Sequence, residues 1–165
     1  MKEGWDYKKL GEIATEMYRG SGIKRDQVTK EGTPCVRYGE IYTTYNISFT
    51  TCVSHAKTED ITSPKYFEHG DLLFAITGES VEDIGKTIAY LGDEKCLCGG
   101  DIICMKHRQN PKYLAYALST PDLPGGAERR LVCHGGLWRG SAGSSAVLRR
   151  LPTVRRSGLR TGRIA

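Results

Sequence analysis

Residues 70–78 read Gly-Asp-Leu-Leu-Phe-Ala-Ile-Thr-Gly, and this stretch decides the fold because it is the most apolar run in the first 122 residues. A short apolar run between two glycines is typical of a strand that is buried on both faces. Two more strands are predicted after it, over residues 87–91 and 101–105, and glycine stands next to each of them. The chain is therefore expected to fold around a sheet that contains residues 71–77.

The segments on either side add strands upstream and a helix downstream. Residues 33–38 and 40–45 are rich in β-branched and aromatic side chains and are separated by Gly39, which predicts strand, turn and strand. Asn110 and Pro111 supply an N-cap and a proline at the first helical position. The helix predicted over residues 112–119 has one apolar face, made of Tyr113, Leu114, Ala117 and Leu118.

Two short turns complete the expected architecture. A helical turn is predicted within residues 5–14 and a capped turn at residues 58–61. The sequence thus predicts an α/β protein of the mixed α+β kind. It should have a curved, mainly antiparallel or mixed sheet and a few helices.

The composition changes abruptly near Asp122. Residues 1–123 contain every Lys and Tyr of the chain and have a net charge of −3, whereas residues 124–165 contain nine Arg and have a net charge of +8. The second segment shows no sustained apolar period. We therefore expect a folded domain over residues 1–122 and a non-native, disordered, Arg/Gly-rich tail over residues 123–165. Because the folded part is not basic, any nucleic-acid surface in it must be a local patch.

The sequence favours a cytoplasmic protein that does not enter membranes. Met1 is followed by charged and polar residues with no apolar leader, and no stretch approaches 18 apolar residues. The six Cys are then expected to be reduced thiols, because the cytosol keeps thiols reduced.

The sequence favours none of three kinds of chemical site. Residues 78–87 end in Gly-Lys-Thr like a phosphate-binding loop, but Ser80 stands where that motif needs glycine and a strand follows instead of a helix. Cys96, Cys98 and Cys104 could join the Cys52 and His55 pair around zinc, but no pair of C-x-x-C knuckles is present, so buried thiols are the default. The four His lie in no recognisable nucleophile context, so no catalytic site is expected.

Two loop regions combine cations with polar and aromatic side chains, which is the composition of a nucleic-acid surface. Cations attract phosphates, while Thr, Asn and Tyr can hydrogen-bond to base edges. The same residue types are also common in ordinary strands. The candidate DNA-contacting residues are Arg19, Lys24, Arg25, Arg37, Tyr42, Thr43, Thr44, Tyr45, Asn46 and Lys86.

Six motifs in one order carry a family resemblance. They are Lys9-Leu-Gly-Glu-Ile-Ala14 with Trp5 and Arg19-Gly20 around it, Gly32-Thr-Pro-Cys-Val-Arg-Tyr-Gly-Glu-Ile41, residues 70–78, Ile84-Gly-Lys-Thr-Ile-Ala-Tyr90, Gly99-Gly-Asp-Ile-Ile103 and Pro111-Lys-Tyr-Leu-Ala-Tyr116. In this order and spacing, residues 5–122 resemble the target recognition domain of the specificity (S) subunits of type I restriction-modification systems.

The resemblance implies a non-catalytic reader of double-stranded DNA. In that family each recognition domain reads one half of a bipartite site, and a full subunit joins two such domains through long helices. It recruits methyltransferase (M) subunits, which bind S-adenosylmethionine, and restriction (R) subunits, which use ATP and Mg. The resemblance therefore implies no cofactor and no metal in this chain itself.

The sequence departs from the family pattern after the helix at residues 112–119. The long spacer helix that the family places there is missing, and the Arg/Gly-rich segment begins instead. We expect a subunit that is truncated or frame-shifted after about residue 122. Two other readings stay open: a small β-rich module that binds protein, or the recognition fragment of a fused restriction-methylation enzyme.

Overall fold

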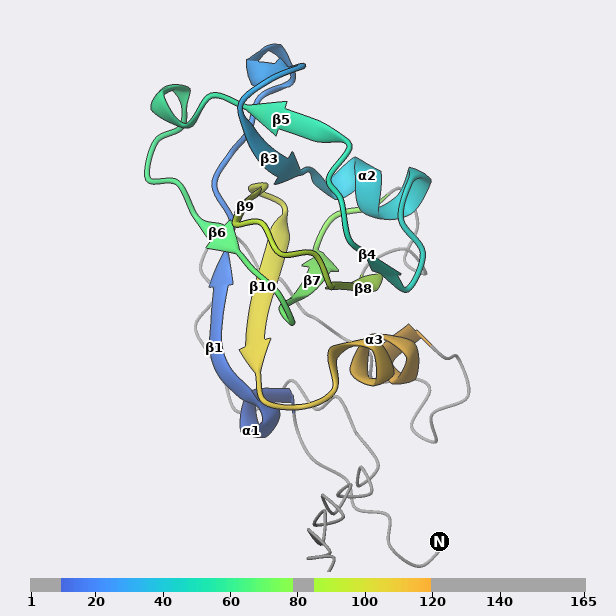
Figure 1. Cartoon of the computed structure of the whole chain (residues 1–165). Coiled ribbons are helices and arrows are strands. Elements are labelled where there is room, and N and C mark those ends of the chain that lie inside the picture. Colours follow the sequence, from blue (N-terminus) through green and yellow to red (C-terminus); the bar gives the residue numbers. More distant parts are fainter. Residues whose placement is uncertain (1–9, 79–84, 120–165) are drawn as a thin grey trace, which may run out of the picture.

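A computed structural model of the chain describes residues 10–78 and 85–119, and Figure 1 shows the arrangement of their elements. Three sequence predictions fall partly or wholly outside these residues: the first part of the turn at residues 5–14, the centre of the loop at residues 78–87, and the tail over residues 123–165. The predicted boundary at residue 122 also lies outside them.

The first of two five-stranded sheets contains β7, which lies within the apolar stretch at residues 70–78. Its strand order is β1-β10-β7-β8-β4, in which β4 and β8 are parallel and the other pairs are antiparallel. Its members are β1 (Ala14–Arg19), β4 (Ser48–Phe49), β7 (Leu72–Ala75), β8 (Thr87–Tyr90) and β10 (Ile102–His107). The buried strands predicted over residues 71–77, 87–91 and 101–105 are thus confirmed as β7, β8 and β10, side by side in this sheet.

The second sheet has the order β2-β5-β3-β9-β6, in which β3 and β9 are parallel and the other pairs are antiparallel. Its members are β2 (Val28–Thr29), β3 (Thr33–Val36), β5 (Ser54–Ala56), β6 (Tyr66–Phe67) and β9 (Cys96–Cys98). The predicted mixed α+β class is confirmed, with the strands divided between two mixed sheets instead of one.

Short helices and helical turns accompany the two sheets, and α3 packs on one face of the first sheet. Figure 1 shows α3 beside the first sheet, where it packs on β8, and α2 next to the second sheet. The described residues form α1 (Leu10–Ile13), α2 (Tyr38–Thr43), α3 (Pro111–Ser119) and the 3-10 turns η1 (Arg25–Gln27) and η2 (Thr58–Asp60). The Asn110 carboxamide accepts the Tyr113 N–H at 2.9 Å, which confirms the predicted N-cap of α3.

Strand β7 is buried on both faces, as its apolar run predicts. Leu73 and Ala75 join an aromatic core cluster that also contains Phe49 and Tyr90. Leu72 lies on the other face, in the cluster under α3. Successive side chains of a strand point to opposite faces, so one strand contributes to both clusters.

Two glycine segments let the sheets approach closely at the end of β1. Ser21 bridges to Gly99 in parallel, and the Ser21 N–H donates to the Cys98 carbonyl at 2.8 Å. A Cβ on Gly20 would lie 2.1 Å from the Gly99 carbonyl oxygen, closer than any real side chain permits. Glycine is therefore required at position 20 for steric reasons.

The strand predicted over residues 40–45 is wrong, because the chain forms helix α2 there. Glu40 stabilises the start of the helix by accepting the Arg37 N–H, and Ile41 and Tyr45, four residues apart, both turn into the core. Core packing thus overrides the strand preference of the Tyr and Thr residues. The predicted face of α3 also needs correction: Leu114 and Ala115 are buried, whereas Tyr113 is exposed.

Candidate nucleic-acid interface

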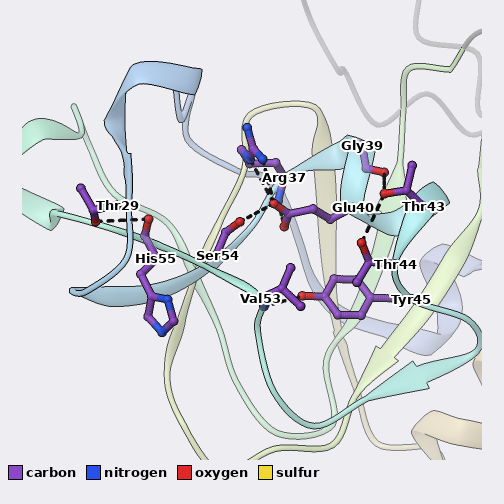
Figure 2. Close-up of polar contacts among 10 residues, drawn as sticks. All are labelled: Thr29, Arg37, Gly39, Glu40, Thr43, Thr44, Tyr45, Val53, Ser54 and His55. Atoms are coloured by element: carbon purple, nitrogen blue, oxygen red, sulfur yellow. Dashed lines mark hydrogen bonds and ion pairs between the residues drawn. The ribbon is translucent and has the colours of Figure 1, made fainter.

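A buried carboxylate fixes the position of α2 on the second sheet (Figure 2). Glu40 is only 7% exposed and accepts the Ser54 hydroxyl at 2.6 Å, which joins the helix to β5. It also accepts the Arg37 guanidinium at 3.0 and 3.1 Å and the Arg37 backbone N–H at 3.1 Å. A buried carboxylate is stable only when its oxygens are paired in this way.

Arg37 therefore has a structural role. Its guanidinium is paired with Glu40 and its side chain is one-third exposed, so it supports the start of α2. Glu40 was missed as an important residue by the sequence reasoning. The signal was present in the Arg37-x-x-Glu40 spacing, since an acid at the third helical position is a common N-terminal capping group.

Tyr45 belongs to the core and not to the surface. It is 7% exposed, its ring stacks on Phe49 at 4.2 Å between centroids, and its hydroxyl accepts the Val53 N–H at 3.0 Å. Burial raises the pKa of the Tyr45 phenol, so the hydroxyl stays protonated at neutral pH. Direct base contact by this side chain would need it to leave the core.

Tyr42 and Lys86 connect the end of α2 to the β7–β8 region. The Tyr42 hydroxyl donates to the Thr77 carbonyl at 2.6 Å. The Lys86 ammonium donates to the Tyr45 and Tyr42 carbonyls at 3.2 and 3.4 Å and lies 5.9 Å from the Tyr42 ring centroid. A cation at helix carbonyls is favourable, so both residues position α2 and its neighbouring loop.

Thr43, Thr44 and Asn46 are the candidate residues of this region whose side chains are exposed. The Thr43 hydroxyl donates to the Gly39 carbonyl at 3.0 Å and lies 3.2 Å from the Thr44 hydroxyl (Figure 2). Each hydroxyl has one hydrogen and two lone pairs, so acceptor capacity remains for a ligand. The exposed polar groups of these three residues are thus accessible from solvent.

The other cationic candidates lie at a different place. Lys24 and Arg25 are exposed on η1, which contacts η2 through the Gln27 carboxamide and the Asp60 carbonyl at 2.5 Å. Strand β3 lies between η1 and α2 in the sequence, and a strand of four residues is about 10 Å long. Arg19 is exposed but paired with Asp101 at 2.7 Å. The structure therefore does not join all predicted residues into one patch.

The surface around η1 and η2 is also electrically balanced. Residues 24–31 and 57–60 together hold four basic and four acidic side chains. Phosphate attraction depends on a local excess of cations, and this surface offers none.

Within residues 10–78 and 85–119, the geometry supports neither the zinc site nor the phosphate-binding loop considered from the sequence. No group of three or more His, Cys, Asp or Glu side chains in this part of the chain is arranged to hold a metal ion. Thr87 begins strand β8, so the Gly-Lys-Thr sequence does not lead into the helix that a phosphate-binding loop needs. No helix among the described residues is long and apolar enough to cross a membrane.

Comparison with solved structures finds chains that contain a similar fold. One similar chain comes from a structural study of complex assembly and conformational transition of the type I R-M system; it superposes with a TM-score of 0.50 at 18% identity, over 72% of this chain and 28% of that chain. The chain shares the fold of a type I restriction-modification protein. No family model matches the sequence, and no curated protein sequence matches it.

Two further restriction-modification structures are specificity subunits. The HsdS subunit from Thermoanaerobacter tengcongensis has a TM-score of 0.48 and 17% identity, over 76% of this chain and 30% of that one. The type I S subunit from M. genitalium has a TM-score of 0.42 and 16% identity, over 78% and 29%. This chain thus spans less than a third of the length of the structures it matches.

Proposed function

We propose that this chain is a DNA-recognition unit of a type I restriction-modification system, which reads one half of a bipartite site. The observation that carries the proposal is the shared restriction-modification fold, reached independently of the six ordered motifs that resemble a target recognition domain. Thr43, Thr44 and Asn46 supply exposed hydrogen-bonding groups on a fixed helix end, as base reading requires.

Catalysis would belong to partner subunits. Methyltransferase subunits would bring S-adenosylmethionine and restriction subunits would bring ATP and Mg, while this chain directs them to a sequence. The net charge of −3 over residues 1–123 fits this division, because the cations that neutralise phosphates would come from elsewhere.

Sequence preference, and not affinity alone, tests the proposal. Residues 124–165 have a net charge of +8 and can attract any DNA, so tight binding at low salt proves nothing about recognition. The full chain would be incubated with duplexes that have a randomised centre, near physiological salt, and the bound fraction sequenced. We expect enrichment of a short motif of a few adjacent base pairs.

The alternatives predict different results in the same experiment. A chain that binds the pool without enriching any motif would be a non-specific binder, and the proposal would fail. A β-rich module that binds protein would retain no duplex once salt screens the basic segment.

A further inference from the structure

The connection from α2 through β4 to β5 has an unusual composition. Charged residues make up 26% of the chain, yet residues 41–54 contain no Asp, Glu, Lys or Arg. Much of this segment is nevertheless on the surface. Its exposed side chains are Thr43, Thr44, Asn46, Thr50, Thr51 and Val53.

Buried side chains between the exposed ones fix the segment to the core. Tyr45, Phe49 and Cys52 are 7%, 8% and 5% exposed and belong to the same aromatic cluster. The backbone is held as well, because the Phe49 carbonyl accepts the Leu91 N–H at 2.8 Å. The exposed side chains therefore stand on a fixed frame.

Two hydrogen bonds hold the end of this segment, at residues 53 and 54, against α2 and the residues that follow it (Figure 2). The Tyr45 hydroxyl accepts the Val53 N–H at 3.0 Å, and the adjacent Ser54 hydroxyl donates to Glu40 at 2.6 Å. These contacts join residues eight and fourteen positions apart in sequence. A binding surface that is rigid before binding loses less conformational entropy when the ligand arrives.

The chemistry of the exposed groups favours bases over phosphates. Phosphate contacts are dominated by cations, and this segment has none. Threonine and asparagine can both donate to and accept from base edges, while threonine and valine methyls can contact the thymine methyl.

We propose that residues 43–53 form one preorganised base-reading surface, in which Thr50, Thr51 and Val53 act together with Thr43, Thr44 and Asn46. Tyr45 is its positioning residue, acting through Val53. This inference rests on the proposed function and extends it, because Thr50, Thr51 and Val53 are not among the residues that the sequence singled out.

The test compares the motifs that full-length variants enrich from duplexes with a randomised centre. Thr50→Ala and Thr51→Ala should each relax the preference at one base pair, by about 5- to 100-fold if a good contact is lost. Thr62→Ala, at an exposed threonine outside the surface, is the matched control and should leave the motif as in the wild type.

Tyr45→Phe tests the positioning role. It removes only the hydroxyl, so it should weaken enrichment of the motif while total binding to the unselected pool stays the same. Tyr18→Phe is its control, because the Tyr18 hydroxyl also contacts a backbone group, the Tyr66 carbonyl, away from this surface. Thermal melting of each variant shows whether the fold is retained.

The outcomes separate this inference from the proposed function. If the wild type enriches a motif and the Thr50, Thr51 and Tyr45 variants enrich the same motif equally well, the base-reading surface lies elsewhere and this inference is overturned. If the wild type enriches no motif, both the inference and the proposed function fail. If the variants instead lose binding to a protein partner with no change in the motif, the surface docks protein and the inference is again wrong.

Discussion

At the scale of single residues, the candidate site depends on buried polar groups more than on exposed cations. Arg37, Tyr42, Tyr45 and Lys86 all look like surface readers in the sequence, yet each is hydrogen-bonded to the framework around α2. Sequence composition shows which residue types are available for binding. It does not show which of them the fold uses for its own support.

Removal of the Glu40 carboxylate should destabilise the protein. Glu40→Ala leaves the Ser54 hydroxyl and the Arg37 guanidinium without their acceptor, at a cost of about 1–3 kcal/mol in the free energy of unfolding. Urea denaturation measures this cost. Glu59→Ala, on the exposed η2, is the control and should change the free energy by no more than about 0.5 kcal/mol. Equal stability of both variants would show that the buried network contributes nothing.

His107 should make stability fall on the acid side of neutrality. Burial lowers the pKa of its imidazole from 6.5, and its Nε2 atom is buried without a hydrogen-bond partner among the described residues. As the pH falls below 6.5, the unfolded chain therefore binds the proton first and unfolding is favoured. When the pH is lowered from 7, the Tm of the His107→Gln variant should therefore fall by less than the Tm of the wild type. His69→Gln is the matched control. An unchanged pH dependence in His107→Gln would contradict this.

At the scale of elements, the apolar pattern was a reliable guide, whereas the β-branched and aromatic pattern was right over residues 33–38, where β3 forms, and wrong over residues 40–45. Strands β7, β8 and β10 could be predicted because each is a short apolar run beside glycine, and α3 because Asn110 and Pro111 begin it. Helix α2 was not predicted, because its one local signal is the Arg37-x-x-Glu40 spacing, and the other contacts that stabilise it come from Ser54 and from the core, both distant in sequence. Strands β4 and β6 have two residues each, which is too short for an alternation of apolar and polar side chains to be recognised in the sequence.

The close approach of the two sheets, where the chain after β1 meets the chain after β9, gives a prediction for this scale. Gly20→Ala would place a Cβ 2.1 Å from the Gly99 carbonyl, so the two sheets would have to separate, which should cost at least about 1–3 kcal/mol. Gly39→Ala is the matched control, because nothing lies within 4 Å of a Cβ there and alanine suits helix α2 better by up to about 1 kcal/mol. Chemical denaturation of both variants checks the expected opposite signs. A Gly20→Ala variant as stable as the wild type would contradict a tight contact between Gly20 and Gly99.

At the scale of the whole molecule, the described residues build the two sheets and α3, and the match to one type I structure spans 72% of this chain and 28% of that one. The sequence resemblance anticipated the mixed α+β fold, and the described residues of its six motifs lie on the strands, turns and helices that build it. The division into two sheets could not be anticipated, since it depends on pairings between distant strands, such as β3 with β9. Of the proposed base-reading surface, the sequence singled out Thr43, Thr44 and Asn46 but not Thr50, Thr51 or Val53.

The most direct measurement of the central claim is a change in methylation specificity. Residues 1–119 would replace one recognition domain of an active type I specificity subunit, and methylated sites would be mapped across a whole genome. If this chain reads half of a bipartite site, one half of the methylated motif should change to a new sequence while the other half is retained. An assembly that still forms but keeps both original halves, or methylates no defined site, would contradict the account.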